Sequence, residues 1–193
     1  MTLQGWLSRA RRAGVREAIK SDRGYDNFQA MIRVAGRRHP LTWDEALALL
    51  HIVYAWMPTM LRLEGFHDQG QRAQLLAVLH KARKGSQLSD SELTLIVQFA
   101  NRSVVGASKL LHILSPESFA IWDSRVAEVF LWEGVTRPTY GKVARYQQYM
   151  ETVRRWALAP SVKGECIRLR ALNSAFAGAS DLRMIEFVMF AKA

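Results

Sequence analysis

The sequence predicts an all-α protein, a compact domain of about eight to ten helices, from three observations. Apolar residues recur at the spacing of one helix face along most of the chain, N-cap signals precede several of these segments, and alternating strand patterns are scarce. The 193 residues are 49% apolar and contain no internal repeat, low-complexity tract or long linker. We therefore expect residues 1–193 to form a single domain with its own core.

Capping signals place two of the helices. In TWDEALALLHIVYAW, Thr42 and Glu45 have the spacing of a capping box, and helical periodicity continues to a stop at Pro58. Ser89 and Glu92 repeat this arrangement in SDSELTLIVQFAN. Each of these segments is therefore expected to begin a helix directly after its Thr or Ser.

Apolar periodicity and breaker residues place the other helices. Three helices are expected at about 139–158, 162–175 and 180–191, separated by Pro160 and by the AGAS stretch. Two earlier apolar faces have helical spacing and consist of Leu93, Ile96, Val97 and Ala100 and of Ala107, Leu110, Leu111 and Leu114.

The chain is strongly basic, with a formal net charge of +10. A charge of this size favours a polyanionic partner, nucleic acid before an anionic membrane surface, although a well-solvated basic surface would give the same count. Residues 1–40 contain nine Lys and Arg against three acidic residues. We expect this basic N-terminal segment to pack on the rest of the domain.

Several classes of protein are excluded by composition. Cys166 is the only cysteine, which excludes a disulfide framework, a cysteine-rich zinc site and a four-cysteine iron–sulfur cluster. The five histidines are scattered without metal-ligand spacing. No run approaches the ~20 apolar residues of a spanning helix, and the N-terminus lacks the apolar core of a secretory signal. We expect a cytoplasmic protein with no metal, no cofactor and no membrane partner.

The stretch SVVGASKLLHILSPESFAIWDSRVAEVF, residues 103–130, carries the most informative arrangement. A helix ending at Asn101 is followed by a tight turn, in which Gly106 supplies backbone freedom, and a second helix begins at once. Such a hairpin presents backbone N–H groups to a phosphate. Lys109 lies near the start of the second helix, and Asp123 lies at the N-cap of a third. Taken singly, Lys109 would be a solvent-facing lysine and Asp123 a plain helix cap.

The order of these features resembles the helix–hairpin–helix DNA glycosylases and, among them, the compact 8-oxoguanine-glycosylase-fold proteins. VVGASKLLHIL resembles the hairpin with its second helix, and FAIWDSRVAEVF resembles the approach to the aspartate of this family. The resemblance implies that residues 91–133 hold the helix–hairpin–helix core, with Asp123 as catalytic carboxylate and Lys109 as nucleophile. Val104 departs from the family's first hairpin glycine, and Ser108 occupies the usual lysine position.

The activity implied by the resemblance is excision of a base from double-stranded DNA by cleavage of the N-glycosidic bond. The Asp123 carboxylate would stabilise positive charge on the deoxyribose. A neutral Lys109 would attack C1′ and form a Schiff base that opens a lyase route; if Lys109 points away, an activated water replaces it. Apolar neighbours would lower the pKa of Lys109 and ionised Asp123 would raise it, and the sequence leaves this balance open.

Base flipping requires a pocket and contacts to the DNA backbone. Aromatic and Met residues on helices are more often core residues, but five side chains are candidates for the pocket wall: Trp122, Trp56, Tyr54, Met57 and His112. The candidates for contacts to the DNA backbone are Arg102, Ser103, Gly106 and Ser108, with Arg11, Arg12 and Arg16 extending the footprint.

Two substrate classes stay open within this interpretation, because the pocket chemistry depends on side-chain directions. One is oxidised purine, removed for repair, and the other is modified cytosine in foreign or phage DNA, attacked for defence. The alternative function is a non-catalytic helix–hairpin–helix DNA-binding protein, followed by a helical protein-interaction domain. In the favoured interpretation the protein is a cytoplasmic monomer that associates with the nucleoid when it is bound to DNA.

Overall fold

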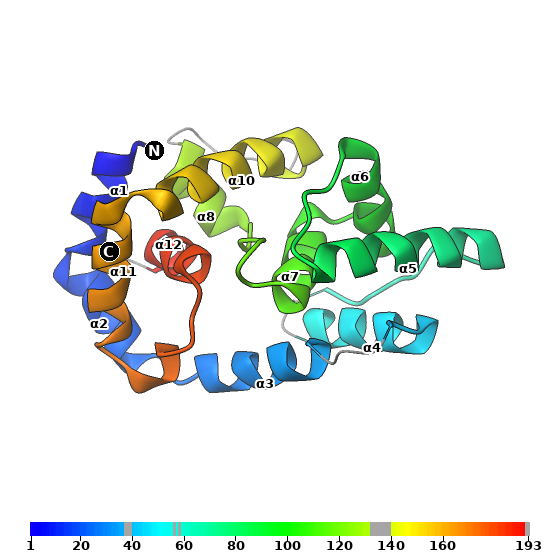
Figure 1. Cartoon of the computed structure of the whole chain (residues 1–193), viewed down its shortest axis with the longest axis horizontal. Helices are drawn as coiled ribbons and strands as arrows, with labels where there is room; N and C mark the ends of the chain where they lie inside the picture. The colour runs from blue at the N-terminus through cyan, green and yellow to red at the C-terminus, as the bar shows by residue number, and fades with distance from the viewer. Residues whose placement is uncertain (37–39, 56, 58, 132–139, 192–193) are drawn as a thin grey trace.

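Eleven α-helices and one short 3₁₀ helix form the secondary structure of the described residues, which contain no β-strand (Figure 1). The structure is a computed structural model and describes residues 1–36, 40–55, 57, 59–131 and 140–191. The predicted all-α class is confirmed, and the eleven α-helices of the described residues exceed the eight to ten that the sequence predicts. The elements are Leu3–Ala10 (α1), Ala13–Ser21 (α2), Tyr25–Ala35 (α3), Trp43–Tyr54 (α4), Gln69–Arg83 (α5), Asp90–Phe99 (α6), Val104–Leu114 (α7), Ser124–Leu131 (α8), Val143–Leu158 (α10), Pro160–Arg170 (α11), Ser174–Phe176 (η1) and Asp181–Phe190 (α12).

Both predicted capping boxes are present. The Thr42 hydroxyl accepts a hydrogen bond from the Glu45 backbone N–H at 3.3 Å, and the Glu45 carboxylate accepts one from the Thr42 N–H at 2.9 Å. The corresponding distances for Ser89 and Glu92 are 3.3 and 2.7 Å. These reciprocal bonds satisfy two of the four free N–H groups of each helix, so α4 and α6 begin where expected. Helix α4 ends at Tyr54, and the expected stop at Pro58 lies outside the described residues.

The helices pack in two groups (Figure 1). Helix α7 is the centre of one group, where α3, α4, α5 and α6 contact it, and α12 is the centre of the other, where α1, α8, α10 and α11 contact it. Helix α3 also contacts η1, and α10 contacts both α6 and α12, so these two helices connect the groups. The two central helices are therefore apolar on nearly all sides, as expected of buried helices.

One expected helix is interrupted by contacts made across the fold. The sequence predicts a helix at about 162–175, whereas α11 ends at Arg170 and η1 begins at Ser174. The Asn173 side chain accepts a hydrogen bond from the Ala175 N–H at 3.0 Å and donates to the Ile19 carbonyl at 2.9 Å. An Asn side chain with a local and a distant partner favours a turn over a continued helix.

The N-terminal segment is attached to the rest of the fold through α12. Trp6, which is fully buried, donates from its indole N–H to the Ile185 carbonyl at 3.0 Å. The Arg9 guanidinium donates to the Val188 carbonyl at 2.8 Å. Helix α1 therefore covers one side of α12. Within the described ranges, each helix is too short or too polar to cross a lipid bilayer.

Candidate functional site

The hairpin between α6 and α7 is built differently from the sequence expectation. Asn101 and Arg102 adopt left-handed backbone conformations, with φ of 57° and 54°, and they form the turn. Val104 to Gly106 instead form the first turn of α7, where the Ser103 hydroxyl accepts a hydrogen bond from the Gly106 N–H at 3.1 Å. The expectation that Gly106 supplies backbone freedom to the turn is therefore wrong.

Gly106 is required by close packing. A Cβ atom at this position would lie 2.9 Å from the Tyr54 hydroxyl oxygen, which is closer than real Cβ contacts. That hydroxyl donates a hydrogen bond to the Ala100 carbonyl at 2.8 Å, at the end of α6. The glycine thus lets a side chain of α4 reach across α7 and hold the hairpin.

Lys109 lies on the one side of α7 that is not fully buried. Nine of the eleven residues of this helix are buried, and only Val105 and Lys109 are partly exposed. Burial lowers the pKa of the Lys109 amine, and this effect outweighs the opposing influence of the Asp123 and Glu186 carboxylates. The balance that the sequence leaves open is therefore decided by desolvation.

The connection from α7 to Asp123 is held by two polar side chains of α7. The Ser108 hydroxyl, which is fully buried, accepts a hydrogen bond from the Trp122 N–H at 3.0 Å and lies 3.1 Å from the Trp122 carbonyl oxygen. The Nδ1 atom of His112 lies 2.6 Å from the Phe119 carbonyl oxygen, and this imidazole is also fully buried. Burial lowers the pKa of His112 to about 3. Ser108 and His112 therefore lie in the core and position the aspartate.

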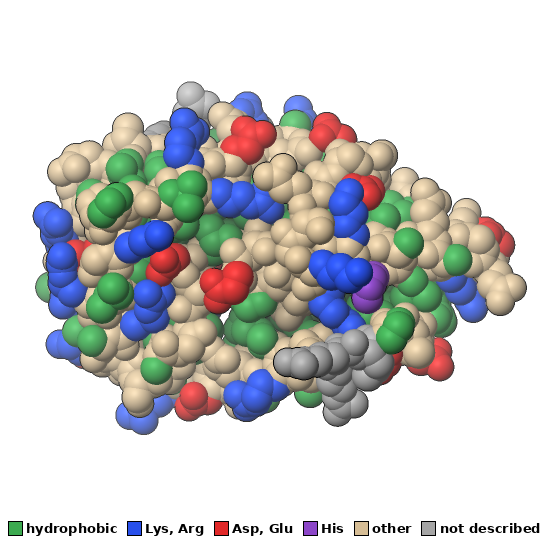
Figure 2. All heavy atoms as spheres, in the orientation of Figure 1, with side chains coloured by type: hydrophobic (Ala, Val, Ile, Leu, Met, Phe, Trp, Pro, Cys, Tyr) green, Lys and Arg blue, Asp and Glu red, His purple; other side chains and the backbone are tan. Residues whose placement is uncertain are grey.

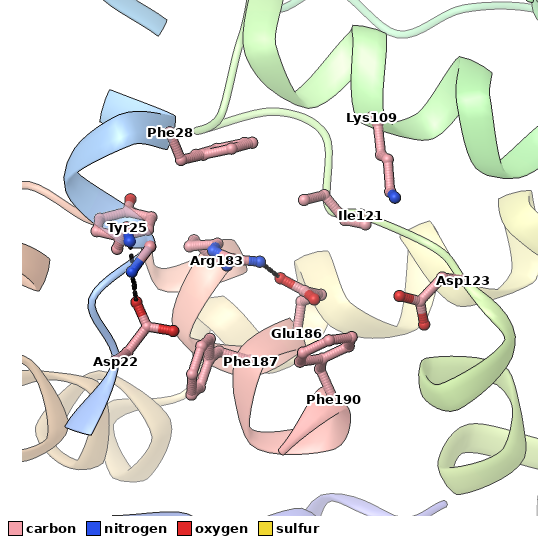
Figure 3. A pocket seen from close by; sticks show the side chains of 11 residues that line it. Asp22, Tyr25, Phe28, Lys109, Ile121, Asp123, Arg183, Glu186, Phe187 and Phe190 are labelled. Carbon is pink, nitrogen blue, oxygen red and sulfur yellow. Dashed lines mark hydrogen bonds and ion pairs between the residues drawn. The ribbon is translucent and has the colours of Figure 1, made fainter. Parts of the chain in front are cut away.

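Asp123 is partly exposed and has two roles. One of its carboxylate oxygens accepts a hydrogen bond from the Val126 N–H at 2.9 Å, which confirms the predicted cap of α8. The carboxylate also points into a cavity, and the Lys109 amine enters the same end of this cavity from α7 (Figure 3). The two groups face the same space without forming an ion pair.

This cavity has a volume of about 240 Å³ and lies between the two groups of helices. Its wall combines one end that carries Lys109 and Asp123 with a larger part that is aromatic and charged (Figure 3). The lining residues are Asp22, Gly24, Tyr25, Phe28, Lys109, Ile121, Asp123, Arg183, Glu186, Phe187 and Phe190.

A second depression, of about 350 Å³, begins at the hairpin and ends at the same two charged residues. Its lining includes Asn101, Arg102 and Ser103, together with Lys109 and Asp123. Lys109 and Asp123 therefore stand where the cavity and the hairpin depression meet. On the face shown in Figure 2, Lys and Arg side chains lie on both sides of a central hollow and acidic side chains lie at its edge.

Arg183 and Glu186, which the sequence interpretation missed, form an ion pair in the wall of the cavity (Figure 3). The Glu186 residue is only 1% exposed. Burial raises its pKa to about 7; Arg183 and Lys109 oppose this rise, whereas Asp123 adds to it. The sequence carries one signal for this pair: after Asp181, the segment LRMIEFVMF is apolar except for an Arg and a Glu one turn apart, and a buried charge is rare unless it is paired.

Several predicted pocket residues lie elsewhere. Trp122 is fully buried, packs on Tyr149 with ring centroids 4.8 Å apart, and does not line the cavity. Tyr54 and Met57 line the hairpin depression, and Trp56 lies outside the described residues.

The N-terminal arginines do not extend the hairpin surface. Arg11 and Arg16 form ion pairs with the buried Glu165 of α11, at 3.7 and 3.5 Å. Arg12 is exposed at the start of α2. Helices α1, α2 and α11 lie at the opposite end of the molecule from the hairpin (Figure 1).

Comparison of the chain with protein-family models, curated proteins and solved structures found no match. The function is therefore inferred from the geometry and chemistry of the site.

Proposed function

We propose that the protein is a DNA glycosylase, which binds double-stranded DNA, takes one damaged or modified base into the cavity and cleaves its N-glycosidic bond. The observation that carries this proposal is the position of Lys109 and Asp123 at the junction of the cavity and the hairpin depression. A flipped nucleotide must place its base in a pocket and its phosphates at the surface. Its sugar then lies between them, at the junction.

The Asp123 carboxylate would stabilise the transition state at this junction. As the bond between C1′ and the base breaks, positive charge develops on the deoxyribose, and a fixed carboxylate beside it lowers the barrier. The bond from the Val126 N–H holds the carboxylate in place before substrate arrives. The reaction then needs little reorganisation of the protein.

Lys109 is suited to attack C1′. A lysine amine is nucleophilic only when it is neutral, and burial lowers its pKa toward that state. Attack would expel the base and join the amine to C1′, and opening of the sugar ring would then give a Schiff base. This intermediate leads either to hydrolysis, which completes base excision, or to cleavage of the backbone by a lyase step.

The hairpin would bind the DNA backbone. The backbone N–H groups of Val104 and Val105, in the first turn of α7, have no partner within the helix, and consecutive left-handed residues before it bring Arg102 to the surface. The Arg102 side chain is 79% exposed and pairs with Glu64 at 3.2 Å, an exposed contact that a phosphate could replace. The strongly basic chain would add attraction at longer range.

A second candidate function has one observation in its favour. Asp123 caps α8, so its carboxylate has a structural role that a non-catalytic DNA-binding protein would also require. In that case the hairpin would act as a phosphate clip and the cavity would have no role in the chemistry.

The two functions are separated by incubating end-labelled duplexes with the wild type, Asp123→Asn and Lys109→Gln. Each duplex carries one altered base: 8-oxoguanine, uracil, 7-methylguanine, or hydroxymethylated or glucosylated cytosine. Alkali-labile sites that require Asp123 would identify a glycosylase and assign its base to repair or defence, and a borohydride-trapped adduct that requires Lys109 would add the Schiff base. Salt-sensitive binding in all three proteins without any abasic site would support the non-catalytic alternative.

A further inference from the structure

Glu186 lies in the wall of the cavity beside the end that carries Lys109 and Asp123, and the chemistry proposed above gives it no role. It lies on α12, and its carboxyl group is directed into the cavity between Arg183 and Asp123 (Figure 3). Buried carboxyl groups are rare because burial removes hydration from the charged form. A Glu that is 1% exposed and lines a cavity therefore suggests a function in that cavity.

The hydrogen bonds of the pair leave capacity for a ligand. Arg183 binds one carboxylate oxygen of Glu186, Oε2, and among the described residues no hydrogen bond reaches the other oxygen. The Nε atom of Arg183 is also buried and has no hydrogen-bond partner there. Its guanidinium is held over the rings of Tyr25, Phe28 and Phe187, at 5.4, 5.3 and 5.4 Å from their centroids. The pair is thus fixed in place in the wall of the cavity, and one Glu186 oxygen has no hydrogen-bond partner in the described part of the chain.

We propose that Glu186 is the acid that donates a proton to the departing base, an inference that rests on the proposed glycosylase function. As the bond between C1′ and the base nitrogen breaks, its electron pair goes to the base, and the proton of the Glu186 carboxyl group moves to the base. The base then leaves as a neutral molecule. The Lys109 nitrogen forms the new bond to C1′, and the proton that it loses returns to the Glu186 carboxylate.

The groups around Glu186 determine when this acid holds its proton. Burial and the Asp123 carboxylate, before α8, favour the neutral form, whereas Arg183 on α12 and Lys109 on α7 favour the ionised form. Tyr149 on α10 and Tyr25 on α3 also face it; a tyrosine is uncharged near neutral pH, and burial raises both of these pKa values further. The acid is therefore half ionised near pH 7.

This role applies to one chemical class of substrate. A base that is neutral in DNA leaves as an anion unless it receives a proton, so its excision depends on the acid. A purine alkylated at N7 already carries a positive charge and leaves as a neutral molecule without a proton. Glu186 should therefore be required for 8-oxoguanine, uracil or hydroxymethylcytosine and dispensable for 7-methylguanine.

The inference is tested by measuring single-turnover excision rates on these four duplexes between pH 5.5 and 8.5. The proteins compared are the wild type, Glu186→Gln, Glu165→Gln and Asp123→Asn. On a neutral base, the wild-type excision rate should fall as pH rises through about 7. Glu186→Gln should excise the same base roughly 100-fold more slowly or worse, and its rate should no longer depend on pH in this range. Glu165→Gln is a matched control, since that carboxylate is equally buried but pairs with Arg11 and Arg16 outside the cavity.

Each other outcome overturns the inference in a recognisable way. Equal rates for Glu186→Gln and the wild type on a neutral base, with Asp123→Asn inactive, would overturn the acid role alone. The acid role would also be overturned if Glu186→Gln lost equal factors of rate on neutral and cationic bases. The same holds if the wild type excised 7-methylguanine and Glu186→Gln did not. If circular dichroism shows Glu186→Gln to be unfolded, a wild-type rate that does not fall between pH 6 and 8 overturns the role. No excision by the wild type overturns both proposals.

Discussion

Replacing Glu186 with Gln should make the stability of the protein depend less on pH. The substitution keeps the shape of the side chain and a hydrogen-bond acceptor for Arg183, and it removes the ionisable group from a site that is 1% exposed. Burial raises the pKa of this carboxyl group from 4.5 in a model peptide to about 7 in the folded protein. The wild type must therefore release a proton in an environment that disfavours the charged form.

The sign and size of the effect follow from this shift. The pKa of Glu186 is higher in the folded protein than in the unfolded protein, so the protonated carboxyl group stabilises the folded state. This stabilisation is complete below the unfolded pKa and is lost as pH rises through about 7. A rise from 4.5 to about 7 corresponds to about 3 kcal/mol at 1.36 kcal/mol per pKa unit. Relative to the wild type, Glu186→Gln should therefore gain about 3 kcal/mol between pH 4 and pH 8.5.

Urea unfolding at the two pH values, followed by circular dichroism, measures the free energy of unfolding of both proteins. Titrating groups that do not interact with Glu186 are shared, so their contributions cancel in the difference between variant and wild type. Glu165→Gln should instead lose stability at both pH values, since it leaves Arg11, Arg16 and Arg168 without their buried partner. A difference between Glu186→Gln and the wild type that is constant from pH 4 to 8.5 would refute the reasoning.

Four further outcomes are expected. Asp123→Asn should abolish excision with stability changed by less than about 1 kcal/mol, since Asn also caps helices, and loss of folding in circular dichroism would contradict this. Gly106→Ala should destabilise by roughly 1–3 kcal/mol in urea because its Cβ would meet the Tyr54 hydroxyl at 2.9 Å, and unchanged stability would contradict the close packing. Arg102→Gly should relieve about 1 kcal/mol of left-handed strain while lowering the salt slope of DNA binding by about 1, measured with a labelled duplex. Lys109→Gln should raise the pKa of Glu186 because it removes a positive charge that lowers that pKa, and an NMR titration of the Glu186 carboxyl ¹³C shift would measure the change.

Local signals in the sequence predicted much of the fold. The capping boxes of α4 and α6 and the cap at Asp123 involve residues within three positions of one another, so their chemistry is visible in the sequence. The turn of the hairpin was misplaced, because Asn101 and Arg102 adopt left-handed conformations that a glycine more often provides. The requirement for Gly106 depends on Tyr54, which approaches from a helix about fifty residues earlier, and no local pattern contains that contact.

Of the residues that line the cavity, the sequence indicates Lys109 and Asp123 but gives no indication of the aromatic wall. Lys109 and Asp123 lie in one short stretch with a recognisable order, and the structure brings them to one cavity. The aromatic wall comes from α3 and α12, which are far apart in the sequence and meet only through tertiary packing. Trp122 was a reasonable candidate by adjacency to Asp123, but successive residues point in different directions and this indole turns into the core.

Glu165 and Glu186 are equally buried, but their surroundings differ in a way that separates a structural carboxyl group from one that stability does not explain. Glu165 lies among Arg11, Arg16 and Arg168, at 3.7, 3.5 and 3.0 Å, so its charge is compensated several times over. Glu186 has one paired arginine and the more distant Lys109, but it also has a facing carboxylate at Asp123 and an open cavity in front of it. The first arrangement joins the N-terminal helices to α11 and is explained by stability alone. The second destabilises the folded protein at neutral pH, and such a local conflict is expected where a residue serves a reaction.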